Sequence, residues 1–581
     1  MLCVVLAGLS VLAAGRSLLI GLDADEQYAV TLAYRMAKGD RLIRDIWDPH
    51  QTSAILPALL IRLFHVFVPD NTYLLLYLRG AGILLQGGAA VLWYGTLKRE
   101  YGSRPAMVTA LVLFHTLPKW IVTPEFANQQ LLFWILTILW LYRFEKTGKL
   151  RCCISAGIAL CFAVLAYPSC ALLFVPYIIW LIRRERRGAL VFTLTCGAGA
   201  GIFIGYLSSY LDISEFVLYM EQILADPSHN AGPGDRLAGY CREAMGLSLY
   251  LLVYLALGAV LSFLFYRIFR SKNTGKVRAP GIFGDDGVYV LSFFTLCTAV
   301  ADQVRLWAFG LVPAVYPQLH YLLLYLLGGI LYHRAAPGVR NRWKKLYCLA
   351  WMPSLAGFGA VLLLTNLDLK ASFVHLLPGM LAALLFWCDG DRTQAADGDK
   401  PVPQKAEQTL SLRLLSAVMW LIVLIGARGY LIRVDEGVPE NVFCVKQKAL
   451  YGAAKNVYCV YMTGYEYNSD TLFIEESLEP GAKVLYIGTR LELIYLMNEI
   501  EVCAASVIST PVYDDRYLKY YELNPDKLPE AVIIDREYFG IMEERNIPIS
   551  AWIREQYDWE NKSESEFLWI MERREGKYRA D

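Results

Sequence analysis

Thirteen apolar runs dominate this chain of 581 residues, and each of the longer ones can cross a bilayer as a helix, which takes about 20 residues. Hydrophobic residues make up 56% of the chain and charged residues 19%, against about 25% charged in soluble domains. We therefore predict an α-helical polytopic membrane protein with about 13 transmembrane helices, and we exclude a soluble enzyme and a disordered chain. The runs are 2–21, 78–97, 106–122, 128–142, 153–169, 170–182, 189–210, 246–266, 287–304, 311–332, 346–364, 373–388 and 412–431.

Basic residues between the runs predict the orientation. Six alternate loops hold 25 Lys and Arg, whereas the loops between them hold five after residue 100. Because cytoplasmic loops carry the excess of Lys and Arg, we assign the basic loops to the cytoplasm, with the N-terminus inside and the C-terminus outside. This assignment requires that 54–69 is an interfacial or re-entrant helix; if it spans, the N-terminus moves outside. The five external basic residues are Lys119, Arg236, Arg242, Arg305 and Lys370.

The chain divides into two parts. Residues 1–431 form the predicted transmembrane module, which has two long external loops, 22–77 and 211–245. Residues 432–581 carry 17 basic and 28 acidic residues, a net charge of −11, and form a predicted extracytoplasmic domain. Short apolar runs separated by helix or turn signals predict that this domain is a small α/β domain. Those runs are 483–488, 531–535 and 567–571.

Other classes of site lack support in the sequence. The 13 cysteines show no metal-binding spacing, and the basic residues lie in short loops and not on one nucleic-acid-binding face. No Walker sequence is present, which disfavours an ATP-driven pump. We assign no metal ligands, although Mg²⁺ or Mn²⁺ stays open as a cofactor.

Three carboxylates, Asp23, Asp25 and Glu26, follow the first apolar run directly. Partial desolvation at the bilayer surface raises the basicity of a carboxylate, as a general base requires. The alternative is structural, because acids at a helix N-terminus complement the dipole and Asp25 can cap the helix.

Further polar residues outside the membrane are candidates for substrate binding. Arg44 and His50 in the first loop can hold the phosphate of a lipid head group. His229 lies in the second loop, which can close as a lid, and Arg305 follows Asp302 at the outer end of a run. Each has a structural alternative: an ordinary polar loop for the histidines, and an ion pair for Arg305.

The first external loop resembles that of the GT-C superfamily of membrane glycosyltransferases. The resemblance is carried by Asp25-Glu26-x-Tyr28, then Gly39-Asp40, then Asp48-Pro49-His50-Gln51, and Leu78-Arg79 at the start of the second run. It covers residues 20–105 and is strongest to the branch that contains protein O-mannosyltransferases and the lipid A aminoarabinose transferase. The family often has a Lys-Pro-Pro-like segment where this chain has His50-Gln51-Thr52, and Asp23 adds a second possible acid.

The resemblance implies the roles of several residues. Asp25 is the implied base and Glu26 its companion, with Asp23 as an alternative base, and Tyr28 and Gln51 join the substrate-binding candidates. The implied donor is a polyprenyl-phosphate sugar, and polyprenyl phosphate is the leaving group.

We therefore predict inverting transfer of a hexose or pentose from this lipid donor to an extracytoplasmic acceptor: a cell-surface glycan, lipid or protein. The alternatives are a transporter or flippase of a lipid-linked saccharide and a non-catalytic membrane assembly protein. The compact chain without long extensions favours the cell membrane of a bacterium.

Overall fold

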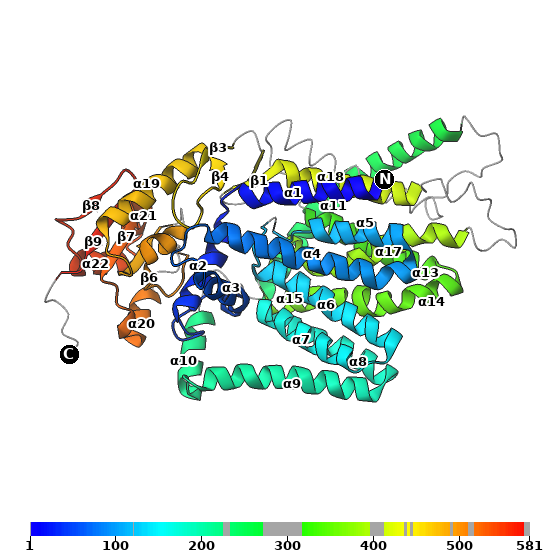
Figure 1. Ribbon diagram of the computed structural model, residues 1–581, viewed down its shortest axis with the longest axis horizontal. Coiled ribbons are helices and arrows are strands. Elements are labelled where there is room, and N and C mark those ends of the chain that lie inside the picture. The colour runs from blue at the N-terminus through cyan, green and yellow to red at the C-terminus, as the bar shows by residue number, and fades with distance from the viewer. Residues whose placement is uncertain are drawn as a thin grey trace.

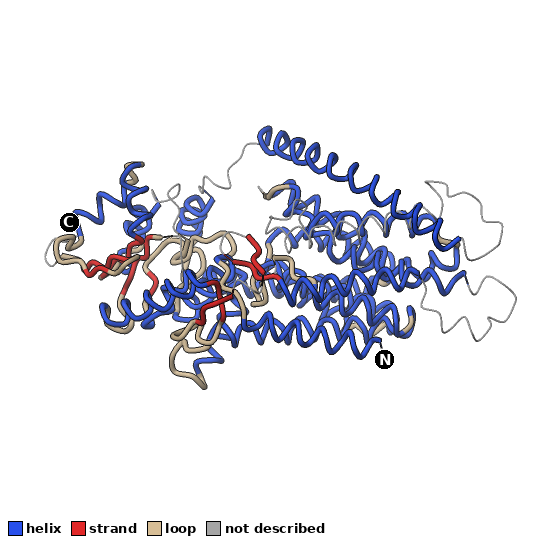
Figure 2. The backbone as a smooth tube through the Cα atoms, turned by 90° about the horizontal axis from the view of Figure 1, so that it is seen from above, coloured by secondary structure: helices blue, strands red, loops and turns tan. Residues whose placement is uncertain are grey.

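The computed structural model describes residues 2–119, 121–224, 233–270, 317–365, 367–394, 412–434, 438–441, 445–488, 492–508 and 516–574. Long helices form a bundle at one end of the molecule, and the C-terminal strands lie at the other (Figure 1). The N-terminus lies at the far end of the bundle from the C-terminal region, and Figure 2 shows the same division from above.

The predicted runs within the described ranges correspond to helices or to successions of short helices over most of their length; the run 287–304 and the start of the run 311–332 lie outside these ranges. Five of these helical stretches are long and apolar enough to cross a membrane, so the count of 13 stays a prediction. The helices of the bundle are α1 (Leu2–Leu19), α4 (Leu74–Tyr101), α5 (Ser103–His115), α6 (Phe126–Thr147), α7 (Arg151–Ala166), α8 (Phe174–Arg184), α9 (Arg186–Ser208), α11 (Pro233–Arg270), α13 (Pro317–Arg334), α14 (Pro337–Leu346), α15 (Met352–Leu364), α17 (Leu377–Gln394) and α18 (Leu412–Tyr430).

Helix α5 ends earlier than its apolar run, which continues to residue 122. The helix stops at His115, and Thr116 has an extended backbone. Pro118 follows two residues later, and a proline disfavours helical geometry in the residue before it. The described residues between His115 and Phe126 therefore form a loop, and this loop contributes to the candidate site.

Three short helices lie at the end of the bundle that faces the C-terminal region: α2 (Ala24–Lys38), α3 (Ile55–His65) and α10 (Ile213–Leu224). Helix α3 occupies the segment predicted to be interfacial, and its 11 residues are about half of what a crossing helix needs. Its Leu59 and Leu63 are half exposed, whereas Ile61 and Phe64 are buried. An apolar face that remains uncovered fits a helix that lies along the membrane surface.

The C-terminal region contains a five-stranded sheet in the order β6-β5-β7-β9-β8. Strands β5, β6 and β7 are parallel, and β9 pairs with β7 in the antiparallel direction. The three apolar runs of the sequence form β5, β7 and β9. The elements are α19 (Tyr461–Ser477), β5 (Lys483–Ile487), β6 (Glu501–Val502), α20 (Arg516–Leu523), β7 (Ala531–Asp535), α21 (Arg536–Glu544), α22 (Pro548–Gln556), β8 (Ser563–Glu564) and β9 (Leu568–Glu572), preceded by the hairpins of β1 (Leu431–Val434) with β2 (Val438–Asn441) and β3 (Val445–Lys448) with β4 (Tyr458–Val460).

The C-terminal region and the external loops share one hydrophobic core. Buried Leu22, Trp47 and Leu78 belong to the same cluster as Tyr219 of α10 and as the strands of the sheet. The bundle has a separate core. The first external loop is therefore packed between the bundle and the C-terminal sheet, and it is ordered from both sides.

Candidate active site

The three carboxylates at the start of α2 have different environments. Asp23 is buried and is the N-cap of α2, where its Oδ1 accepts a hydrogen bond from the Glu26 backbone N–H at 3.3 Å. Glu26 is also buried, and its two oxygens bind Arg79 of α4 at 3.0 and 2.5 Å. Arg79 further donates to the carbonyl oxygens of Leu18 and Gly21. Asp23 and Glu26 thus fix the junction between α1, α2 and α4.

Asp25 points away from this junction. Its side chain is 39% exposed, and its Oδ2 lies 3.3 Å from Nζ of Lys119 in the loop between α5 and α6. Lys119 is itself partly exposed, at 29%. Of the three acids, Asp25 is therefore the one that faces accessible space beside a cation.

Lys119 contacts an aromatic ring. Nζ of Lys119 lies 4.2 Å from the ring centroid of Phe126, the first residue of α6. The imidazole of His50 stacks on Phe126, with centroids 4.0 Å apart and an interplanar angle of 7°. Tyr167 lies 5.6 Å from His50, at the end of α7. Asp25, Lys119, Phe126 and His50 together form what we call the Asp25 site.

Hydrogen bonds between distant segments hold the His50 side of the site in place. Gln129 of α6 donates through Nε2 to the carbonyl oxygens of Ser53 and Pro124, at 2.8 and 2.7 Å. Thr52 donates to the carbonyl oxygen of Leu165 in α7 at 2.6 Å. The short helix η1 (Gln51–Ala54) is therefore attached to both α6 and α7, which positions His50 over Phe126.

The loop that bears Lys119 is attached to the start of α6. Glu125 is the N-cap of α6 and accepts from the backbone N–H groups of Ala127 and Asn128 at 2.8 and 2.7 Å. Burial raises the pKa of Glu125; the charge of Lys119 opposes this shift, and that of Asp25 adds to it. The amide of Asn128 binds the carbonyl oxygens of Ile121 and Thr123.

The same loop packs closely against α4. A Cβ atom on Gly82 would lie 2.0 Å from the carbonyl oxygen of Val122. A cavity of about 30 Å³ lies beside this contact, between α4, Val122 and Asn128. Glycine at position 82 therefore permits the loop to lie where it presents Lys119.

The remaining candidates in the first loop bind other parts of the protein. Gln51 is buried, accepts from the Ile43 N–H through Oε1 and donates to the Asp48 carbonyl oxygen through Nε2. Arg44 is 32% exposed and pairs with Asp45 and with Asp526 of the C-terminal region. These contacts give Gln51 and Arg44 structural partners, and their predicted role in substrate binding stays a prediction.

Tyr28 is buried in the same α2 helix. Burial raises its pKa well above the usual value, and the negative charges of Asp48 and Asp25 raise it further. Its phenol therefore stays protonated at neutral pH and lies in the electrostatic field of the site. The predicted residues His229 and Arg305 lie outside the described residues.

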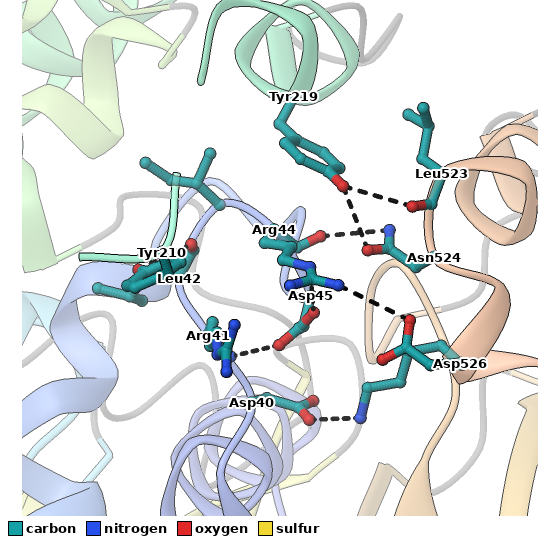
Figure 3. Close-up of polar contacts among 12 residues, drawn as sticks. Asp40, Arg41, Leu42, Arg44, Asp45, Tyr210, Tyr219, Leu523, Asn524 and Asp526 are labelled. Atoms are coloured by element: carbon teal, nitrogen blue, oxygen red, sulfur yellow. Dashed lines mark hydrogen bonds and ion pairs between the residues drawn. The ribbon is translucent and has the colours of Figure 1, made fainter. Parts of the chain in front are cut away.

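A buried polar network connects the first loop with the C-terminal region (Figure 3). Arg35 of α2 is buried and donates to Asp40 at 2.7 Å. Lys527 binds the other oxygen of Asp40, also at 2.7 Å, and reaches Glu501 at 3.1 Å. Tyr219 of α10 lies 3.4 Å from both the carbonyl oxygen of Leu523 and the side-chain oxygen of Asn524.

The chain around Asp48 is held by further contacts. Asp48 is buried, accepts from Ser506 at 2.5 Å and lies 3.9 Å from Arg35. The backbone N–H of Trp47 binds the carbonyl oxygen of Ala505 at 2.9 Å. The C-terminal region therefore fixes the segment that leads directly to His50.

Sequence reasoning did not single out Lys119, Glu125, Phe126 or Arg35 as functional. The sequence contains one indication of Lys119, which is one of five basic residues in the predicted external loops after residue 100. The contact with Asp25 joins residues 94 positions apart, which no local pattern reveals. Across the described ranges, no group of three or more His, Cys, Asp or Glu side chains is arranged to hold a metal ion.

Comparison with known proteins agrees with the predicted resemblance. Residues 52–208 match the family described as dolichyl-phosphate-mannose-protein mannosyltransferase. The match includes Lys119 and Phe126, whereas Asp25 and His50 precede it. It confirms the predicted resemblance to the GT-C superfamily, and the apolar helices agree with the predicted multi-pass membrane protein.

The comparison with solved structures lists two membrane enzymes that share little sequence with this chain. The apo crystal structure of ArnT from Cupriavidus metallidurans has a TM-score of 0.42 and 10% identity, covering 98% of this chain and 97% of that one. The archaeal oligosaccharyltransferase AglB from Archaeoglobus fulgidus, in complex with an inhibitory peptide and a dolichol-phosphate, has a TM-score of 0.38 and 11% identity, covering 94% and 72%. No curated protein matches the chain significantly in sequence.

Proposed function

We propose that this protein transfers a sugar from a polyprenyl-phosphate donor to an acceptor on the extracytoplasmic side of the cell membrane, with Asp25 as the base. The observation that carries the proposal is the contact of the Asp25 carboxylate with Lys119, at the outer end of the bundle where a lipid head group arrives. The matched family, described by its dolichyl-phosphate-mannose donor, makes polyprenyl-phosphate mannose the first donor to test.

In this mechanism Asp25 removes a proton from the acceptor hydroxyl. The hydroxyl oxygen attacks the anomeric carbon from the face opposite the phosphate, and the bond between that carbon and the phosphate oxygen breaks. The electron pair leaves with polyprenyl phosphate, so the configuration at the anomeric carbon is inverted. A positioned base contributes about 10²–10⁴-fold to the rate of such a step.

Lys119 has two roles in the proposal. Its ammonium stabilises the negative charge that develops on the departing phosphate. The phosphate also competes with Asp25 for Lys119, and a carboxylate that loses an opposite charge becomes more basic. The donor itself would thus activate Asp25. The Phe126 ring and the stacked His50 offer an apolar surface beside the cation, on which a sugar ring can pack.

The test has two parts. Mass spectrometry of surface glycans from cells with and without this protein identifies the transferred sugar by its mass difference. Purified protein is then supplied with polyprenyl-phosphate hexose or pentose and the glycan from the deficient cells, and release of polyprenyl phosphate is measured. Release that requires the acceptor supports the proposal. An unchanged glycan profile together with no release in vitro rejects it in favour of transport or assembly.

A further inference from the structure

The last turns of three helices meet at the end of the bundle that faces the C-terminal region. Arg16 lies in the last turn of α1, His115 is the last residue of α5 and Arg428 lies in the last turn of α18. Helices α1 and α18 run side by side in Figure 1. We call Arg16, His115 and Arg428 the outer arginine cluster.

Arg428 is 2% exposed and uses only part of its hydrogen-bonding capacity. Its Nε donates to the Ser17 hydroxyl at 3.1 Å, and its Nη1 donates to the Phe114 carbonyl oxygen at 2.7 Å. Its Nη2 is enclosed and has no hydrogen-bond partner among the described residues. Arg16 adds a second guanidinium, whose Nη1 donates to the Arg428 carbonyl oxygen at 3.3 Å.

The ring of His115 also has unused hydrogen-bonding capacity. It is 2% exposed, and neither ring nitrogen has a hydrogen-bond partner within the described part of the chain. Within the same part, no carboxylate forms an ion pair with Arg428, whereas the comparably buried Arg79 and Arg35 each bind an acid. The C-terminal ends of the three helices each carry a partial negative charge of about −0.5, which stabilises the positive charges of Arg16 and Arg428. This attraction does not give Nη2 of Arg428 a hydrogen-bond acceptor.

Buried cations without a counter-charge are costly, and ionisable groups at membrane depth usually serve a ligand or pair with one another. We propose that the outer arginine cluster binds the phosphate of an anionic lipid head group in the outer leaflet. The last turns of crossing helices lie at head-group depth, and a phosphate oxygen can accept from several guanidinium N–H groups at once. Leu12 and Leu19 of α1 are exposed beside Arg16 and can contact the acyl chains.

The site lies on the loop that also forms the Asp25 site. His115 precedes Lys119 by four residues, and Gln86 of α4 holds the intervening Thr116 carbonyl oxygen at 2.9 Å. A lipid bound at the cluster would therefore order the start of this loop. The inference does not depend on the glycosyltransferase proposal, because it concerns binding alone.

The test is a binding measurement on the purified full-length protein by native mass spectrometry. Dioleoyl phosphatidylglycerol is titrated against dioleoylglycerol, which has the same acyl chains and no phosphate. We expect Arg428→Gln and Arg16→Gln each to raise the Kd for phosphatidylglycerol about tenfold or more, and Arg428→Lys to raise it less. Arg413→Gln, at the opposite end of α18, is the control and leaves this Kd unchanged.

Arg16 is only half buried, so its variant keeps the test valid if Arg428→Gln does not fold. Wild-type affinity in Arg16→Gln and in a folded Arg428 variant overturns the proposal. Equal affinity of the wild type for dioleoylglycerol also overturns it. Full competition by millimolar inorganic phosphate would indicate a soluble anion and would overturn the assignment to a lipid.

Discussion

Gly82→Ala tests whether the loop of Lys119 must lie where the structure places it. The substitution adds one methyl group on α4, and that Cβ would lie 2.0 Å from the Val122 carbonyl oxygen, 3.1 Å from the Val122 carbonyl carbon and 3.3 Å from the Thr123 carbonyl carbon. All three contacts are with backbone atoms, which cannot rotate away as a side chain can. The loop between Lys119 and Glu125 must therefore shift.

The magnitude follows from the overlap. Non-bonded atoms at optimal contact lie about 3.5 Å apart, so the loop has to move by more than about 1 Å. Overpacking of this kind costs about 1–3 kcal/mol, and alanine returns about 1 kcal/mol through its higher helix propensity. Stability therefore falls by about 2 kcal/mol at most. A 1 Å displacement of a catalytic group can lower the rate by about 10²-fold, so we expect activity to fall far more than stability.

Gly80→Ala is the matched control on the same helix, because nothing lies within 4 Å of its added Cβ. Both variants are assayed for release of polyprenyl phosphate and for thermal unfolding in detergent. We expect near-normal turnover in Gly80→Ala and about 10²-fold slower turnover in Gly82→Ala, with both proteins folded. Wild-type turnover in Gly82→Ala would show that the position of this loop is irrelevant to activity.

Three further substitutions test the structural roles assigned around the site. Glu26→Gln leaves Arg79 buried without its counter-charge, so unfolding in denaturant should show a loss of about 3–5 kcal/mol, and no loss would refute the structural role of Glu26. Lys527→Ala should destabilise the protein by about 3 kcal/mol and speed amide exchange in the first external loop, because it removes the buried pair with Asp40. The control Lys519→Ala removes an exposed pair and should cost less than about 1 kcal/mol. Equal effects would contradict the role of Lys527 in holding the first loop against the C-terminal region. Burial raises the pKa of Glu125 in the folded state above its unfolded value of about 4.3. The folded state therefore binds more protons than the unfolded state between these two pKa values, and the stability of the wild type should fall as the pH rises from the unfolded to the folded pKa. The thermal midpoint of Glu125→Gln should lack this pH dependence. Identical pH profiles of the thermal midpoint in the wild type and Glu125→Gln would refute the raised pKa of Glu125.

The helices of the bundle could be predicted because the signal is local. Apolar runs of about 20 residues predict the helices directly, and the orientation predicted from the basic loops stays a prediction. The prediction failed at the end of α5, since Ile121 and Val122 continue the apolar run beyond the helix. There the conformational restriction by Pro118 outweighed hydrophobicity.

The chemistry of adjacent acids could not be predicted from their order in the chain. Asp25 and Glu26 are neighbours, but the helix turns one toward Arg79 and the other toward Lys119, and only those distant partners distinguish a structural acid from an accessible one. The shared core of the first loop and the C-terminal sheet is equally non-local, because Lys527 and Asp40 are 487 residues apart. The resemblance to GT-C enzymes selected Asp25 as the candidate base. The contact with Lys119 shows how Asp25 differs physically from Asp23 and Glu26.

The most direct test of the account is the turnover number of Asp25→Asn against that of Asp23→Asn. Asparagine keeps the shape of the side chain but cannot accept the acceptor proton, and Asp25 contributes no buried contact to the α1–α2–α4 junction. With purified protein, a polyprenyl-phosphate sugar and the acceptor, we expect kcat to fall by about 10²–10⁴-fold in Asp25→Asn while thermal stability and donor binding persist. Asp23→Asn should keep most of its turnover, because Asn also caps helices well. Near-normal turnover in Asp25→Asn, with or without loss in Asp23→Asn, would contradict the assignment of Asp25 as the base.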